Sequence, residues 1–326
     1  MDENKKLEIA KDNILRKSSD NFEDNFKIQG YNFNDKLDYS KLIDSYFNTG
    51  FQATNLSKSI EIIKKMRAEK CTIFLGYTSN MVTSGLRDIF RYLAENKLID
   101  VIVTTAGGVE EDLIKCIKPF LLGDFNASGK ELRDKGINRT GNIFVPNDRY
   151  VEFEKFFVPL IDRIAKLKES YTPSELIEIL GKEINNEESI YFWCTKNNIP
   201  VFCPAFTDGS MGDMVYFYLY KNNKFKIDIA ADIKKLNDIA ITSKKTGLII
   251  LGSGVVKHHI LNANMFRNGA NYSVYINNSQ EFDGSDAGAR PDEAVSWGKI
   301  LPEANSVQVF GDATILFPLI VAKCFI

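Results

Sequence analysis

The chain has 326 residues, of which 44% are hydrophobic, and it carries a formal net charge of −2 with a pI near 5.9. This length allows a sizeable buried core in one or two domains, and the near-neutral charge gives no basis for binding nucleic acid or an anionic membrane. Five cysteines without CxxC spacing indicate reduced thiols, so neither a disulfide framework nor a metal site is expected. Since no apolar window approaches eighteen residues, we expect a soluble, cytoplasmic protein.

The chain begins with a polar stretch, 1–30, which is expected to extend a single domain at 31–326. Residues 39–70 have a helical pattern and lead into an apolar run at 71–76, which is typical of a buried parallel strand. Small polar residues at 77–85 and an amphipathic helix follow. A strand, a turn and a helix N-terminus in this order can cradle an anion, although an ordinary capped turn accounts for the pattern equally well.

The next unit repeats this arrangement, with a strand expected at 101–105, a tight turn at 106–108 and a helix at 109–118. The glycines of the turn would let the backbone approach a phosphate or a ribose. Glu110 and Glu111 would repel phosphate, so they fit ribose hydroxyls or a cation better. The stretch has no GxGxxG and is not a standard dinucleotide fingerprint.

A long central region is expected to have structural roles. Residues 119–150 are rich in glycine and asparagine and are expected to form connections, and helices are expected at 150–168 and 172–181. The second of these helices begins with a capping box, with Thr172 as the N-cap and Glu175 as the third helical residue.

Two acids follow the next short strand, which is expected at 199–204. Asp208 and Asp213 are five residues apart after this strand. Open α/β sheets bind ligands at the carboxyl ends of their strands, which is where these acids would lie, although most Asp-Gly turns are only turns.

The only two histidines, His258 and His259, follow a buried strand at 246–251 and a glycine turn. Most histidines are not catalytic. An imidazole placed after such a turn is nevertheless a candidate base, because it titrates near neutrality.

The stretch at 281–300 gathers the largest set of reactive side chains. Pro291 starts a short helix, and Gly298 ends it just before Lys299. Within seventeen residues lie three carboxylates, an indole and an amine, namely Asp283, Asp286, Glu293, Trp297 and Lys299. This set predicts a pocket for a cation with a possible nucleophile at its end. Acids and lysines also occupy helix ends in most proteins, and on spacing alone that structural interpretation is favoured.

At least five strand–turn–helix units predict an α/β fold, with a doubly wound, mostly parallel sheet and helices on both faces. A last strand is expected at 307–310, before an apolar helix at 315–326. The glycines and acids of interest fall at strand carboxyl ends, where such folds bind ligands.

Several stretches resemble one family. EFDGSDAGARPDEAVSWGK at 281–299 closely resembles the signature of deoxyhypusine synthase, and TTAGGVEEDLIKC at 104–116 and PAFTDGSMGD at 204–213 resemble other parts of that family. GSGVVKHH at 252–259 differs at Ser253, where the family has a glycine that approaches NAD. The family continues beyond the end of this chain into a polar helical tail, so we expect the sequence to be clipped there.

The resemblance implies a Rossmann-like, NAD-binding catalytic domain at 31–326 and a homotetramer with NAD and substrate at subunit interfaces. The implied reaction transfers the 4-aminobutyl group of spermidine to a lysine of the initiation factor 5A precursor, which forms deoxyhypusine. Lys299 would displace 1,3-diaminopropane and hold the group as a covalent imine, and His258 would act as the base. We expect the acids to face the far amine of the substrate, with Lys299 in the drier part of the site.

The resemblance also implies site residues. Those expected to bind substrate are Glu110, Glu111, Asp213, His258, Asn262, Gly284, Ser285, Asp286, Glu293, Trp297 and Lys299. Those expected to bind NAD are Ser79, Asn80, Met81, Val82, Thr83, Thr105, Ala106, Gly107, Glu111, Asp208, Ser253, Asn278, Ser279, Asp283, Asp312 and Ala313.

Three alternatives stay open. Homospermidine synthase shares this site and passes the group to a small amine, and nothing in the pocket residues separates it from the first hypothesis. A catalytically silent paralogue that activates a partner subunit is the second alternative, although Lys299, His258, Asp213 and Glu293 are all present. A generic nucleotide-binding module is the third.

Overall fold

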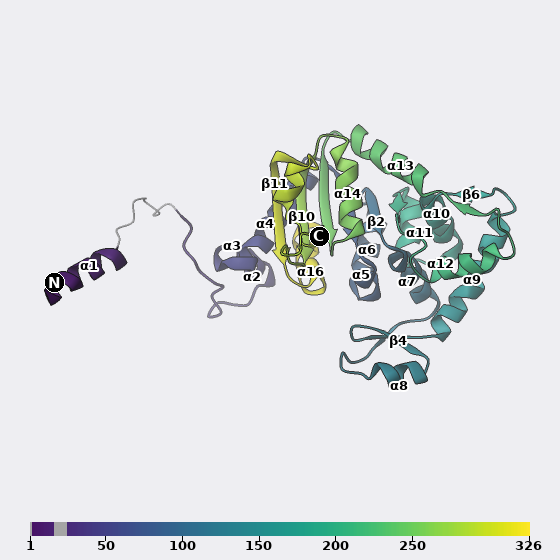
Figure 1. Cartoon of the computed structure of the whole chain (residues 1–326), viewed down its shortest axis with the longest axis horizontal. Coiled ribbons are helices and arrows are strands. Elements are labelled where there is room, and N and C mark those ends of the chain that lie inside the picture. Colours follow the sequence, from purple (N-terminus) through teal and green to yellow (C-terminus); the bar gives the residue numbers. More distant parts are fainter. Residues whose placement is uncertain (1, 16–24) are drawn as a thin grey trace.

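A six-stranded sheet forms the centre of the protein (Figure 1). The structure is a computed structural model that describes residues 2–15 and 25–326. The strand order is β11-β10-β9-β1-β2-β7, and each neighbouring pair is parallel. The strands are β1 (Thr72–Tyr77), β2 (Val101–Thr104), β7 (Val201–Phe202), β9 (Thr246–Leu251), β10 (Ala270–Asn277) and β11 (Ile300–Phe310). The predicted α/β fold with a parallel sheet is confirmed.

Helices account for most of the remaining regular structure. They are α1 (Glu3–Ile14), α2 (Tyr39–Asp44), α3 (Tyr46–Thr49), α4 (Phe51–Ala68), α5 (Ser79–Thr83), α6 (Leu86–Glu95), α7 (Ala106–Ile117), α8 (Gly129–Asp134), α9 (Asp148–Ile164), α10 (Pro173–Ile184), α11 (Ile190–Asn197), α12 (Ser210–Leu219), α13 (Ile229–Thr242), α14 (Val255–Met265), α15 (Pro291–Ser296) and α16 (Ala313–Cys324). Among the described helices, none combines the length and apolar character needed to cross a membrane.

Both faces of the sheet are covered, as β9 illustrates. All six of its residues are buried. Because side chains alternate along a strand, Ile249 and Leu251 belong to one core while Leu248 and Ile250 belong to the other. Helices α4, α6, α7 and α16 pack on the first core, and α13, α14 and α15 on the second. The sheet is therefore doubly wound.

The expected turn at 106–108 is wrong, because α7 begins at Ala106 and its first turn contains both glycines. A Cβ on Gly108 would collide with the Thr104 hydroxyl, so this glycine allows close packing of the helix on β2. The helical pattern at 39–70 is divided into three helices, with Gly50 at φ +97° before the longest of them.

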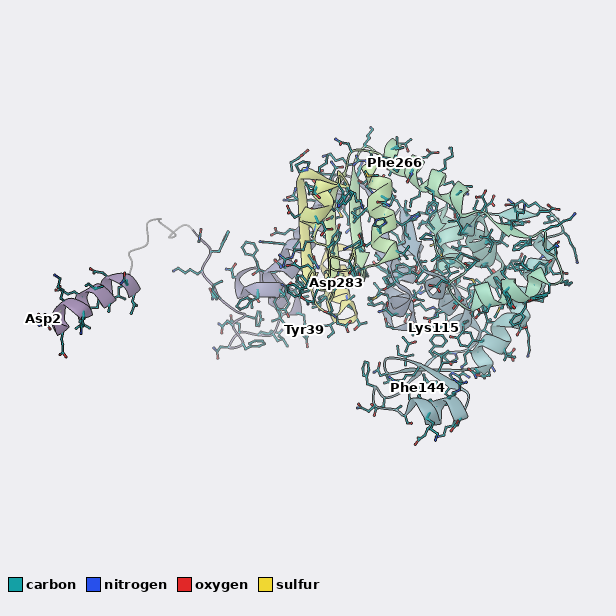
Figure 2. The ribbon with its side chains drawn as sticks, in the orientation of Figure 1. Asp2, Tyr39, Lys115, Phe144, Phe266 and Asp283 are labelled. Atoms are coloured by element: carbon teal, nitrogen blue, oxygen red, sulfur yellow. The ribbon has the colours of Figure 1, made fainter. Side chains whose placement is uncertain are left out.

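Residues 119–150 were expected to be connections, and this prediction is also wrong. They form a small antiparallel sheet, β3-β5-β4, together with α8, which projects from the main body in Figure 1. Its strands are β3 (Leu121–Leu122), β4 (Ile137–Thr140) and β5 (Ile143–Pro146). Phe144, labelled in Figure 2, packs so closely on Gly123 that a Cβ there would collide with its ring. Strands β3 and β4 are largely exposed, which explains why their sequence lacks a strong strand pattern.

Two further features complete the fold. The predicted capping box of Thr172 and Glu175 is confirmed at the start of α10. A two-stranded parallel sheet pairs β6 (Ser170–Tyr171) with β8 (Lys226–Ile227).

Helix α1 buries none of its residues against the described part of the chain. The division at residue 30 stays a prediction, and residues 1 and 16–24 of that extension lie outside the described residues.

Candidate active site

The carboxyl ends of the parallel strands lie along one edge of the sheet, and helices α7 and α14 are among those that begin there. Helix α7 follows β2 and α14 follows β9, and within the described chain neither N-terminus receives a side-chain cap. The N–H groups of their first turns therefore remain available to an anionic ligand. The backbone N–H of Ser79 donates to the Thr105 hydroxyl at 3.0 Å, which ties the start of α5 to the start of α7.

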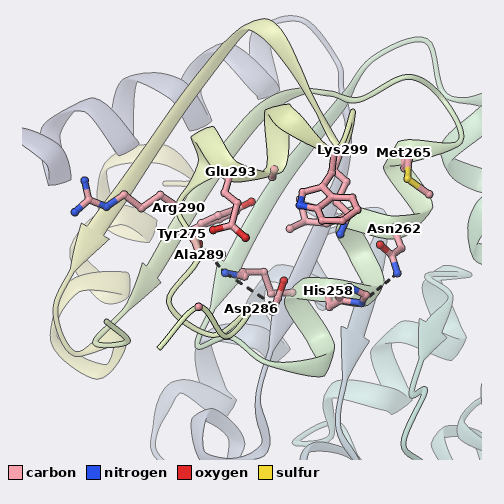
Figure 3. Close-up of a pocket in the computed structure, with 14 residues that line it drawn as sticks. His258, Asn262, Met265, Tyr275, Asp286, Ala289, Arg290, Glu293 and Lys299 are labelled. Carbon is pink, nitrogen blue, oxygen red and sulfur yellow. Dashed lines mark hydrogen bonds and ion pairs between the residues drawn. The ribbon is translucent and has the colours of Figure 1, made fainter. Parts of the chain in front are cut away.

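A pocket of about 360 Å³ opens beside α14 and α15 (Figure 3). Its wall comes from those helices, from the loop that precedes α15, from Trp297 and Lys299 after it, and from Tyr275 of β10. Seven predicted substrate-binding residues line it, namely His258, Asn262, Gly284, Asp286, Glu293, Trp297 and Lys299. The structure therefore gathers most of the predicted set in one place.

The position of Lys299 follows from the local sequence. Pro291 begins α15, and Gly298 takes φ +69° after the C-cap Trp297, so the helix ends just before Lys299 as predicted. The backbone of Lys299 then pairs with its surroundings, donating to Ala294 O at 2.9 Å and accepting from Ala270 N at 3.0 Å. These bonds hold Lys299 in the fold with only 8% of the residue exposed.

The amine of Lys299 lies deeper than the aromatic and acidic groups around it. Its Nζ is 5.5 Å from the centre of the Trp297 ring, and Trp297 itself is 63% exposed. The Asp286 side chain is 31% exposed, and Glu293 is exposed as well. The pocket thus has a buried amine at one end, the exposed carboxylate of Glu293, and the partly exposed carboxylate of Asp286, whose Oδ2 is buried.

His258 lies on the first turn of α14, where it is exposed to the pocket. A contact of 3.1 Å joins its Nδ1 to the side-chain amide of Asn262, one turn further along, and the tautomer of the ring decides which group donates (Figure 3). This contact orients the imidazole. The neighbouring His259 is half-buried, and burial together with the charge of His258 lowers its pKa.

Lys257 is a pocket residue that the sequence prediction missed. It is completely buried, and its Nζ donates to Ala289 O at 2.8 Å and lies 4.0 Å from Asp286. Its pKa is lowered by burial, and the negative charges of Asp286 and Glu293 oppose that shift. The helical spacing of the sequence could have indicated its burial, because residue 257 lies one turn before the buried Leu261 on the same face of α14.

The remaining predicted substrate residues lie elsewhere. Glu110 and Asp213 line a second pocket, of about 660 Å³, beside α9 and α12. Glu111 faces α5, where it accepts a hydrogen bond from the Thr83 hydroxyl. Ser285 is exposed in the loop, where its N–H donates to Asp283 at 2.9 Å. One copy of the chain thus divides the predicted substrate residues between two pockets.

Comparison with known proteins identifies the family. The sequence profile of deoxyhypusine synthase matches residues 41–324. The chain belongs to the deoxyhypusine synthase family. It is 52% identical to deoxyhypusine synthase of Arabidopsis thaliana, with 92% of this chain and 90% of that protein aligned. It is 51% identical to the probable deoxyhypusine synthase of Drosophila melanogaster, over 97% of this chain and 94% of that protein.

A solved structure agrees with this assignment. A crystal structure of an Entamoeba histolytica protein named for the same activity superposes with a TM-score of 0.69 at 35% identity, covering 91% of this chain and 96% of that one. The chain is accordingly an enzyme with deoxyhypusine synthase activity.

In this member of the deoxyhypusine synthase family, the residues predicted to bind the cofactor all follow strands of the main sheet. Ser79–Thr83 follow β1, Thr105–Gly107 and Glu111 follow β2, Asp208 follows β7, Ser253 follows β9, Asn278, Ser279 and Asp283 follow β10, and Asp312 and Ala313 follow β11. The hydroxyls of Ser253 and Ser279 are 3.2 Å apart, so the segments after β9 and β10 meet. Among residues 2–15 and 25–326, no cluster of three or more His, Cys, Asp and Glu side chains could hold a metal ion.

The carboxyl group of Glu111 predicts a pH dependence of stability in this deoxyhypusine synthase. Burial raises its pKa from 4.5 to about 7, and the Thr83 hydroxyl opposes the rise. Because the folded state holds this proton more tightly than the unfolded state, the stability that it contributes is complete below about pH 4.5 and is lost as the pH rises through about 7. We expect a loss of about 2–3 kcal/mol from this group between about pH 5 and about pH 8.

Urea unfolding of Glu111→Gln at the two pH values measures this contribution, since the amide cannot ionise. The free energy of unfolding of this variant should fall less with pH than that of the wild type. Glu131→Gln, at an exposed position of α8, is the matched control and should follow the wild type. An equal fall in wild type and Glu111→Gln would contradict the prediction.

Proposed function

We propose that the chain catalyses the NAD-dependent transfer of the 4-aminobutyl group of spermidine to a lysine of the initiation factor 5A precursor, which forms deoxyhypusine, through a covalent imine on Lys299. One observation carries this proposal: the buried amine of Lys299 shares a pocket with Trp297 and with the carboxylates of Asp286 and Glu293. Membership in the deoxyhypusine synthase family gives the reaction class.

The two carboxylates of the pocket support a polyamine substrate, in a lining that also contains the cations Lys257, Arg290 and Lys299. Spermidine is a linear cation, and Asp286 and Glu293 offer it two negative charges in one pocket. An indole face adds roughly 0.5–2 kcal/mol to the binding of a nearby ammonium group, and Trp297 provides that face at the exposed side. With the acids nearer solvent than Lys299, the distal ammonium would bind toward the mouth and the reacting carbon toward the amine.

The carboxyl edge of the sheet supports NAD as the cofactor. The open N-termini of α7 and α14 suit a pyrophosphate, and the polar groups after β7, β9 and β10 suit ribose hydroxyls. The residues that would hold NAD include Ser79, Thr105, Asp208 and Ser253. When bound, NAD supplies the acceptor for the hydride that leaves the carbon beside the secondary amine of spermidine, and it returns that hydride at the end of the reaction.

The chain's own residues would perform the transfer. His258, oriented by Asn262, accepts the proton from the secondary amine of spermidine. Lys299 forms a bond from Nζ to the oxidised carbon and loses a proton, and the bond from that carbon to 1,3-diaminopropane breaks. The product is an imine between Lys299 and the four-carbon fragment. The acceptor lysine then bonds to the same carbon and releases Lys299.

The proposed assembly is a homotetramer in which each site takes residues from two copies. Support comes from the division of the predicted substrate residues, since Asp213 and Lys299 line different pockets of one chain. A second copy placed against the first would bring an Asp213 to a Lys299 pocket. Closed symmetric assemblies of identical chains readily build such shared sites.

The decisive experiment supplies the purified chain with NAD, spermidine and the initiation factor 5A precursor. We expect release of 1,3-diaminopropane and a mass increase of one aminobutyl group on a single lysine of the acceptor. Transfer to putrescine with an unmodified acceptor protein would instead identify a homospermidine synthase. If the chain alone releases no diaminopropane with NAD, the proposal fails and a silent paralogue takes its place.

A further inference from the structure

Lys115 is not among the predicted site residues, yet it joins two helices that carry many of them. It lies in the last turn of α7, and its Nζ reaches the end of α5. There it donates to three backbone carbonyls in succession, those of Val82 at 2.6 Å, Thr83 at 2.6 Å and Ser84 at 3.0 Å. The last carbonyls of a helix have no partner within it, and a cation suits their partial negative charge. Lys115 therefore caps the end of α5 from α7.

The three hydrogen bonds use the full donor capacity of the amine. A lysine ammonium has three N–H donors and no acceptor. With one carbonyl for each donor, Lys115 has none left for a phosphate oxygen or another ligand group. The side chain also lines a pocket of about 580 Å³ that shares no residue with the Lys299 pocket. The contacts of Lys115 are thus with the backbone of the protein.

Helix α5 is short and depends on α7 at both of its ends. It has five residues, 79–83, and all five are predicted to bind NAD. At its start, the N–H of Ser79 donates to the hydroxyl of Thr105, the N-cap residue of α7. At its end, Glu111 accepts the Thr83 hydroxyl, and Lys115 holds the three carbonyls one helical turn further along α7. A single turn of helix gains little stability of its own, so these contacts decide where α5 lies.

We propose that Lys115 is a positioning residue for the cofactor: it holds the end of α5 against α7, so that residues 79–83 and the open N-terminus of α7 face NAD together, and it makes no contact with NAD itself. The inference rests on the proposed function, in which residues 79–83 bind NAD. It assigns a task to a lysine that lies outside both pockets of predicted substrate residues.

The first measurement is hydrogen–deuterium exchange of the full chain without any ligand. Burial and the charge of Arg87 lower the pKa of Lys115 to about 8, while Glu111 opposes this shift, so pH 7 keeps the amine charged. In Lys115→Met the amides of residues 79–84 should exchange about fivefold faster or more, since the end of α5 loses its charged donor. Lys115→Arg keeps a cation with several donors and should retain most of the protection.

The second measurement is the Kd for NAD, by calorimetric titration. Lys115→Met should raise it about tenfold, the loss expected for a charge-assisted contact, and Lys115→Arg should restore it to within about threefold of the wild type. At saturating NAD, kcat and the KM for spermidine should change less than about twofold. A general loss of stability would not confine the effect to cofactor affinity.

Two further variants complete the design. Lys118→Met removes a positive charge from the C-cap of the same helix, where the side chain forms an exposed ion pair with Asp148. It is the matched control and should leave both the exchange and the Kd for NAD unchanged. Lys115→Gln keeps two donors on a neutral side chain, so its values should lie between those of Lys115→Met and Lys115→Arg. It replaces Lys115→Met if that variant does not fold.

Two results would overturn the proposal. Unchanged exchange in Lys115→Met would show that Lys115 does not hold α5, and weaker NAD binding alongside it would indicate a direct contact with the cofactor. Faster exchange with an unchanged Kd for NAD would show that Lys115 serves only the local stability of α5. If the wild type binds no NAD, the proposed function fails instead, and the exchange measurement still decides whether Lys115 holds the helix.

Discussion

Replacing Lys299 by alanine is expected to abolish aminobutyl transfer, with a loss of at least about three orders of magnitude in turnover, as for other covalent nucleophiles. The physical reason is that the oxidised carbon needs an amine to bond to, and Lys299 presents one beside Trp297. Borohydride reduction of the wild type with NAD and spermidine should leave a four-carbon amine adduct on the peptide that contains Lys299, as read by mass spectrometry.

Lys257 provides an internal control for this experiment, because it is the second amine of the same pocket. Lys257 is completely buried and its Nζ donates a hydrogen bond to Ala289 O, so this amine should stay unmodified. Lys299→Ala should therefore lose the adduct entirely without transferring it to Lys257. An adduct on Lys257, or normal turnover with Lys299 unmodified, would show that the nucleophile was assigned wrongly.

The parts of the site that could be predicted from the sequence are those with local causes. Pro291 starts a short helix and Gly298 ends it, and the turn after the helix places Lys299 in the pocket. The strand β9 was predicted with its observed limits, because a strand buried on both faces reads as a continuous apolar run. In both cases the pattern and the structure depend on the same few neighbouring residues.

The acids of α7 show why other parts could not be predicted. From the sequence alone, Glu110 and Glu111 were predicted to bind a cation or ribose hydroxyls. Successive helical residues point about 100° apart, so each acid meets a different partner. Glu110 receives the N–H of Met211 on α12, and Asp112 accepts the Ser189 hydroxyl at 2.6 Å at the start of α11. The neighbours that decide these roles are about eighty to one hundred residues away in the chain.

Mixing an inactive variant with one that binds substrate weakly is expected to restore activity, which tests the sharing of the site between copies. Lys299→Ala lacks the nucleophile, and Asp213→Asn lacks a carboxylate whose loss should weaken amine binding by about tenfold to one hundredfold. If each site combines Lys299 of one copy with Asp213 of another, random mixing makes half of the pairs hybrid. One of the two sites in each hybrid pair is then fully wild type, so about a quarter of all sites should recover.

Co-expression of the two variants with different affinity tags, followed by tandem purification, isolates the mixed tetramers, in which about two in seven of the sites should be active. The assay is release of 1,3-diaminopropane at a spermidine concentration well below the KM of Asp213→Asn, and each variant assembled with itself is the control. A further control assembles wild-type chains with a chain that carries both substitutions. If the site is shared, a pair of one wild-type and one doubly substituted copy should contain no wild-type site. Wild-type sites should then occur only in pairs of two wild-type copies. The opposite result has two parts: the two single variants do not restore activity to one another, and pairs of one wild-type and one doubly substituted copy remain active. That result would show that Lys299 and Asp213 act within one copy. The two pockets of a single chain would then have to come together by a movement of α12 toward α15.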